Sequence, residues 1–152
     1  MRRIEDCVEI ILRDSKKHIV NGKYICYLGL SVYRYLLDKY PDIPVEVANA
    51  AVLIDFYNYS NKKPGYLESK GFSLRTDYLV SVLEIRDANY FRKENETEYL
   101  NRIMLCYDIW ASRILQAKYY LLYQHYSDQK NFDNDLSDKY EKLYVKLLKN
   151  VK

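Results

Sequence analysis

The stretch "KYICYLGLSVYRYLLDKY", residues 23–40, decides the fold class, because its apolar side chains would lie on nearly every face of a helix. A helix that is apolar all round is buried among other elements instead of presenting one face to water. Its two small residues, Gly29 and Ser31, would let a neighbouring helix approach closely. We therefore predict that this segment is the central, largely buried helix of the protein.

The dipeptide Asn21-Gly22 stands directly before this helix and is a typical stop signal, since glycine suits the end of a helix. Upstream of it, apolar residues recur at helical spacing and predict a helix over 2–20. We expect these two helices to form an antiparallel hairpin.

The rest of the chain also has the pattern of helices. Glycine and proline number only 4 and 3, too few for a turn-rich β-sandwich or barrel. Ser73 and Asn95 are residue types that cap the N-termini of helices. The apolar periodicity predicts further helices over 45–60, 74–92, 96–126 and 135–150.

These segments predict an all-α fold. We expect a single domain over residues 1–152, a bundle of about six helices with one long helix in its C-terminal half. Its predicted core includes Leu28, Val52, Leu83, Trp110, Ile114 and Leu121.

The composition narrows the functional classes. Hydrophobic residues make up 49% of the chain, which is typical of a globular protein, and the net charge of +3 allows a nucleic-acid partner without requiring one. No run approaches ~18 uninterrupted apolar residues and no signal peptide is visible, so we expect no membrane span and a cytoplasmic location. With only two histidines and three scattered cysteines, expected to be reduced, no metal site or cofactor is predicted; the cysteines are Cys7, Cys26 and Cys106.

The stretch "VLEIRDANYF", residues 82–91, carries the candidate binding site. On the predicted helix over 74–92, Arg86 falls on the inward face, flanked by Asn89 and Tyr90. An inward arginine needs a partner, because an unpaired buried charge is costly. Three readings stay open: Arg86 reaches solvent where the helix leaves the core, it pairs with an acid of the bundle, or it lines a pocket that binds an anion such as phosphate.

Two segments give the chain its resemblance to a known family. "VNGKYICYLGLSVYRYLLDKY" has a turn followed by a Gly-Lys-Tyr-like segment, and "LEIRDANYFRKENETEYLNRIMLCYDIWASRI" has an Arg followed by Ala-Asn-Tyr and then a long helix. In these features residues 5–125 resemble HEPN domains, which are small helical bundles. The resemblance implies a homodimer and a partner protein, often a nucleotidyltransferase of a toxin–antitoxin pair, or ribonuclease activity on RNA.

The ribonuclease motif of that family pairs an Arg with a His a few residues later. Arg13 and His18 have this spacing, and no His follows Arg86 in the same way. At ~100° per residue, His18 would lie on the apolar face of helix 2–20 and Arg13 on the wet side, so the two should not converge within one protomer. Arg13 and His18 are therefore a weak catalytic candidate.

Two functional hypotheses follow. The first is an HEPN-like helical module, non-catalytic or weakly ribonucleolytic, that binds a nucleotidyltransferase partner or RNA. The second is a small helical interaction protein of a viral or CRISPR defence system without enzymatic activity. Under both hypotheses we expect a two-fold homodimer. A bundle of six helices would not fully cover the apolar helix 23–40 and the long helix 96–126, and the apolar patch left exposed would favour association.

Overall fold

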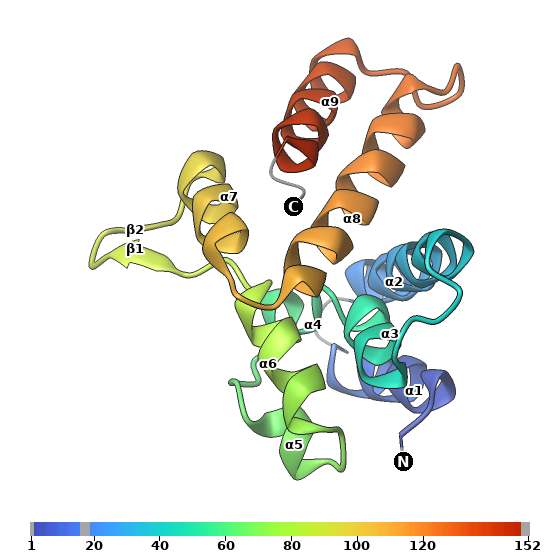
Figure 1. Cartoon of the computed structure of the whole chain (residues 1–152), viewed down its shortest axis with the longest axis vertical. Coiled ribbons are helices and arrows are strands. Elements are labelled where there is room, and N and C mark those ends of the chain that lie inside the picture. The colour runs from blue at the N-terminus through green and yellow to red at the C-terminus, as the bar shows by residue number, and fades with distance from the viewer. Residues whose placement is uncertain (1, 16–18, 150–152) are drawn as a thin grey trace.

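The computed structural model describes residues 2–15 and 19–149, and most of them are helical (Figure 1). The long helix α2 lies in the middle of the N-terminal half, where it contacts α1, α3, α4 and α8. The all-α class is thus confirmed. The helix α2 is central in its contacts, but the prediction that it is largely buried is wrong, because one of its faces, with Tyr27, Ser31 and Arg34, is exposed. The helices are α1 Ile4–Asp14, α2 Ile19–Lys39, α3 Val45–Val52, α4 Phe56–Tyr59, α5 Tyr66–Ser69, α6 Leu74–Val82, α7 Glu96–Leu105, α8 Ile109–Ser127 and α9 Asn134–Leu148.

The predicted boundary at Asn21-Gly22 is wrong, because α2 begins at Ile19 and continues through both residues. A glycine inside a helix costs only ~1 kcal/mol. The contacts that α2 makes with four other helices outweigh this local preference.

The other helices are shorter and more numerous than expected. The predicted helix 45–60 is interrupted at residues 53–55, the connection 61–71 contains the short α5, and the predicted long helix 96–126 breaks at residues 106–108. The longest helix is consequently α2 and not one in the C-terminal half.

The predicted helix 74–92 ends at Val82, where side chains of another helix, α7, donate hydrogen bonds to the backbone carbonyl groups. Arg102 of α7 donates to the carbonyl oxygens of Val82 at 2.6 Å and Glu84 at 2.7 Å, and the Tyr99 hydroxyl donates to that of Leu83 at 2.6 Å. Helix-terminal carbonyls need such partners. Residues 87–93 instead form an antiparallel hairpin of β1 Asp87–Asn89 and β2 Arg92–Lys93, which projects from the side of the molecule (Figure 1).

The core is one connected cluster that reaches from Cys7 in α1 to Leu147 in α9. Of the six predicted core residues, Leu28, Val52, Leu83 and Ile114 are buried. Trp110 and Leu121 are only partly buried and pack against the cluster.

The helices α8 and α9 form an antiparallel pair at the C-terminal end of the fold (Figure 1). Tyrosines hold them together: the Tyr119 and Tyr140 rings lie 5.8 Å apart and those of Tyr120 and Tyr144 lie 5.3 Å apart. Among the described residues, no helix is long and apolar enough to cross a membrane.

Candidate protein-binding groove

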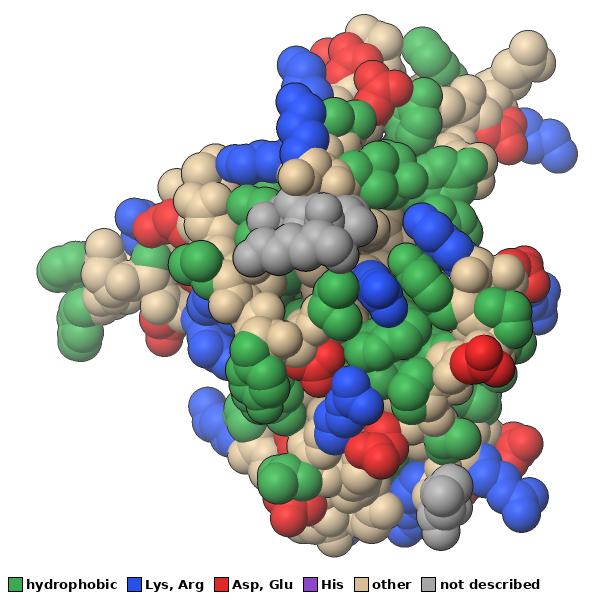
Figure 2. Space-filling view, viewed as in Figure 1, with side chains coloured by type: hydrophobic (Ala, Val, Ile, Leu, Met, Phe, Trp, Pro, Cys, Tyr) green, Lys and Arg blue, Asp and Glu red, His purple; other side chains and the backbone are tan. Residues whose placement is uncertain are grey.

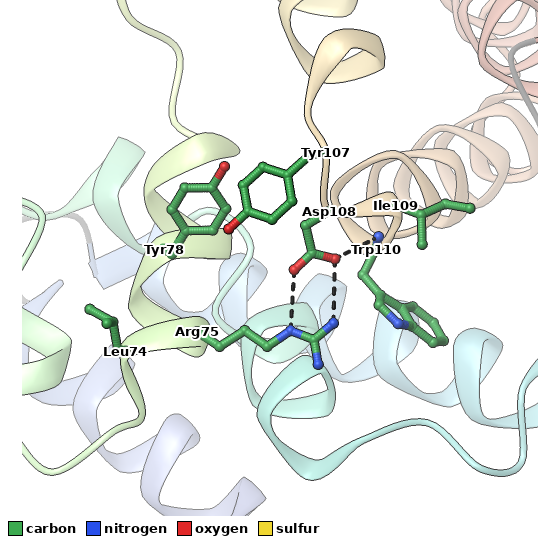
Figure 3. A pocket seen from close by; sticks show the side chains of 7 residues that line it. All are labelled: Leu74, Arg75, Tyr78, Tyr107, Asp108, Ile109 and Trp110. Atoms are coloured by element: carbon green, nitrogen blue, oxygen red, sulfur yellow. Dashed lines mark hydrogen bonds and ion pairs between the residues drawn. The ribbon is translucent and has the colours of Figure 1, made fainter.

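The break between α7 and α8 ties the start of α8 to the start of α6. Asp108 precedes α8 and caps it, since its carboxylate accepts from the Trp110 backbone N–H at 3.1 Å. The same carboxylate accepts from Arg75 of α6, at 3.1 Å from Nε and 3.4 Å from a terminal nitrogen (Figure 3). This two-pronged ion pair fixes the two N-terminal ends side by side.

A groove of about 800 Å³ lies between these ends. Its walls are mainly aromatic and aliphatic, and three of its large apolar side chains are strongly exposed: Leu74 at 68%, Tyr107 at 87% and Ile109 at 41%. A hollow of this size with adjacent exposed apolar side chains is typical of a binding surface. The groove is lined by Leu74, Arg75, Tyr78, Tyr107, Asp108, Ile109 and Trp110.

Three polar side chains of the groove, Arg75, Asp108 and Tyr78, already have partners. The hydrogen bond that Arg75 donates to Asp108 raises the pKa of Arg75, so the guanidinium stays charged. The Tyr78 hydroxyl lies 3.5 Å from the Cys106 sulfur, and this contact together with burial raises the pKa of Tyr78 to about 12. Arg75 and Tyr78 therefore keep their protons near neutral pH.

The three residues predicted as a binding site lie together on the hairpin, outside the groove. Arg86 is exposed at the base, where it donates to the Ser81 carbonyl at 3.4 Å. The Asn89 side-chain oxygen accepts from the Phe91 backbone N–H at 2.8 Å and so shapes the turn. Tyr90 is 95% exposed at the end of the hairpin, beside Phe91 at 90%, and Figure 2 shows apolar side chains at this projecting end.

Because the Arg86 side chain is exposed, we expect Arg86→Ala to change the free energy of unfolding by no more than ~0.5 kcal/mol. Chemical unfolding measures this change. A loss of several kcal/mol would instead support the buried ion pair. Binding of an anion by Arg86 stays a prediction.

The base of the hairpin depends on an ion pair, which makes it sensitive to pH. Both oxygens of Glu94 accept from Arg102, at 2.9 and 2.8 Å, and one also accepts from the Arg86 backbone N–H at 2.8 Å. The Arg102 hydrogen bonds lower the pKa of Glu94 below its ordinary value of 4.5. A lowered carboxyl pKa contributes stability that is present above the ordinary value and is lost as the pH falls through the folded-state pKa.

We therefore expect the hairpin to loosen only in acid, as the pH falls below the ordinary carboxyl value of 4.5. Carbon-13 NMR of the Glu94 carboxyl should give a pKa below 4.5 in the native protein and a higher pKa in Arg102→Met. Equal values in the two proteins would contradict this coupling.

The structure describes only one member of the weak catalytic pair, Arg13. The exposed Arg13 donates to the Asp14 carboxylate at 3.3 and 3.4 Å, and Asp14 also accepts from the Tyr66 hydroxyl at 2.7 Å. His18 lies outside the described residues.

The sequence did not predict the groove, because the predicted helix over 96–126 ran without a break through residues 106–108. The sequence did contain a signal for this break: Asp108 stands just before Ile109 and Trp110, and aspartate is a common N-cap residue.

No family model, curated protein or solved structure matches this chain.

Proposed function

We propose that the protein is a non-catalytic helical module that binds another protein, and that the groove between α6 and α8 receives an apolar segment of that protein. The observation that carries the proposal is the exposure of Leu74, Tyr107 and Ile109 around one hollow. Burying such side chains against a partner contributes ~25 cal/mol for each Å² of apolar surface removed from water.

The charges favour a protein over RNA as the partner. RNA is held mainly by cations that pair with its phosphates. Arg75 in the groove is bonded to Asp108, and on the hairpin Lys93 pairs with Asp87 at 3.5 Å and Arg92 with Glu98. A nucleotidyltransferase partner, as the resemblance to HEPN domains implies, would have to present an apolar segment to the groove.

The non-catalytic part of the proposal rests on the chemistry of the site. In the groove the Asp108 carboxylate is held by Arg75, and the hydroxyl of Tyr78 has a raised pKa and lies against the Cys106 sulfur. Among the described residues, no group of three or more His, Cys, Asp and Glu side chains could hold a metal ion.

Photo-crosslinking from the groove tests the proposal. With a photoreactive amino acid at Tyr107, in cells of the protein's source, we expect adducts with protein. The added change Leu74→Glu, which places a charge in the groove, should lower the adduct yield at least ~10-fold.

Phe132 supplies the matched control, because it is a large apolar side chain, 64% exposed, in the turn between α8 and α9. Phe132→Ser should leave the yield from Tyr107 unchanged. Adducts with RNA alone, or a yield that does not respond to Leu74→Glu, would contradict the proposal.

A further inference from the structure

We propose, on the basis of the groove's proposed role in protein binding, that its occupant is the hairpin tip of a second copy of this chain. The hairpin tip consists of Tyr90 and Phe91, at the end of β1 and β2. The exchange is reciprocal: each copy inserts its tip into the groove of the other and so closes a two-fold dimer.

The hairpin tip has the form of a rigid aromatic wedge. The two rings meet edge to face, with centroids 5.3 Å apart and planes at 80°. The hydrogen bond from the Phe91 N–H to Asn89 fixes the turn that carries them. Rings that are 95% and 90% exposed have no place to bury in their own chain, and large aromatic side chains at the end of a projecting element are typical anchors of an interface.

The groove suits such a wedge in size and in lining. Its volume of about 800 Å³ falls in the range that holds a drug-sized ligand, which is the scale of two aromatic side chains. Tyr78 and Tyr107 form one wall, with ring centroids 5.8 Å apart (Figure 3). Aromatic rings pack favourably against one another in tilted and edge-to-face arrangements.

A second hollow of the described surface is a poorer match. It has a volume of about 500 Å³ and lies between α1, α2 and α3. Arg2, Arg3 and Glu5 are among its lining residues. Aromatic rings packed there would remove these charged side chains from water, which is unfavourable.

The charges of the two strands and of the groove have partners. At the hairpin, Asp87 pairs with Lys93 across the strands, and in the groove Arg75 pairs with Asp108. A contact between the hairpin tip and the groove would leave none of these four charges without a partner, which is the costly case.

The area is also sufficient. A buried aromatic side chain removes about 150–250 Å² from water. Two rings on each of two tips remove about 600–1,000 Å² from water, and the groove walls that they cover bring the total toward the lower end of the size of a standard stable interface.

A complementation experiment tests the proposal. The tip variant Tyr90→Ser/Phe91→Ser keeps its groove, and the groove variant Leu74→Ser/Tyr107→Ser keeps its tip. All four side chains are exposed, so each variant should fold, as circular dichroism and thermal unfolding would check. By sedimentation velocity at tens of micromolar, we expect the native chain to be a dimer and each variant alone to associate at least ~30-fold more weakly.

The decisive sample is the equal mixture of the two variants. The tip of the groove variant still fits the groove of the tip variant, so the mixture should form a heterodimer that neither variant forms alone. Phe132→Ser is the matched control and should remain a dimer.

A monomeric native chain, variants that dimerise like the native chain, or a mixture without heterodimer would each overturn the reciprocal exchange. The crosslinking from Tyr107 shows whether only the dimer proposal fails or whether the proposed function, protein binding, fails with it. Adducts with a different protein would refute the second copy as the occupant and leave protein binding standing, whereas the absence of any protein adduct would refute both.

Discussion

We expect Gly29→Ala to destabilise the protein by about 3 kcal/mol, although alanine is the better helix former. On an isolated helix this change would stabilise by ~1 kcal/mol. In the folded chain the new Cβ would collide with the carbonyl oxygen of Val52 and lie 2.9 Å from its carbonyl carbon. Both are backbone atoms at the end of α3, so α2 and α3 would have to move apart.

Urea unfolding measures this effect as a lower transition midpoint at an unchanged slope. Ser31→Ala is the matched control, because Ser31 is an exposed residue two positions further along α2. It should change the free energy of unfolding by no more than ~0.5 kcal/mol. A Gly29→Ala protein as stable as the native one would mean that α2 and α3 do not approach so closely.

We expect the second large effect from Asp77→Ala. Asp77 is 3% exposed in α6, and its carboxylate accepts from the Tyr57 hydroxyl at 2.7 Å and from the backbone N–H groups of Gly65 at 3.2 Å and Glu68 at 3.0 Å. These bonds hold the connection between α4 and α6 against the core. Removal of the acceptor should cost about 3–5 kcal/mol, since each unsatisfied donor costs about 1–3 kcal/mol.

Asp77→Asn serves as the comparison, because it keeps one oxygen for Tyr57 and Gly65 but turns an amide donor toward the Glu68 N–H. We expect an intermediate loss of stability. Hydrogen exchange should show the backbone N–H groups of Gly65 and Glu68 losing protection in Asp77→Ala. Full protection together with a loss below ~1 kcal/mol would contradict the role of the carboxylate.

The sequence determined the features that depend on neighbouring residues. Ser73 accepts from the Thr76 N–H at 3.1 Å and begins α6, and Asn95 with Glu98 forms a capping box at the start of α7. A cap involves residues three positions apart, so a short window of sequence contains all of its chemistry. The apolar residues of 23–40 likewise indicated that α2 contacts several other helices, although one of its faces, with Tyr27 and Ser31, is exposed.

Only the tertiary structure decided where α6 ends and where the candidate site lies. The helical pattern continued through Arg86, but Arg102 and Tyr99 of α7 take the carbonyl groups at the end of α6, and the chain turns into a hairpin. The groove likewise joins Arg75 to Asp108, 33 positions apart in the chain. Periodicity describes one helix at a time and carries no information on which distant side chain will bond to its end, so these features appear only when the helices pack.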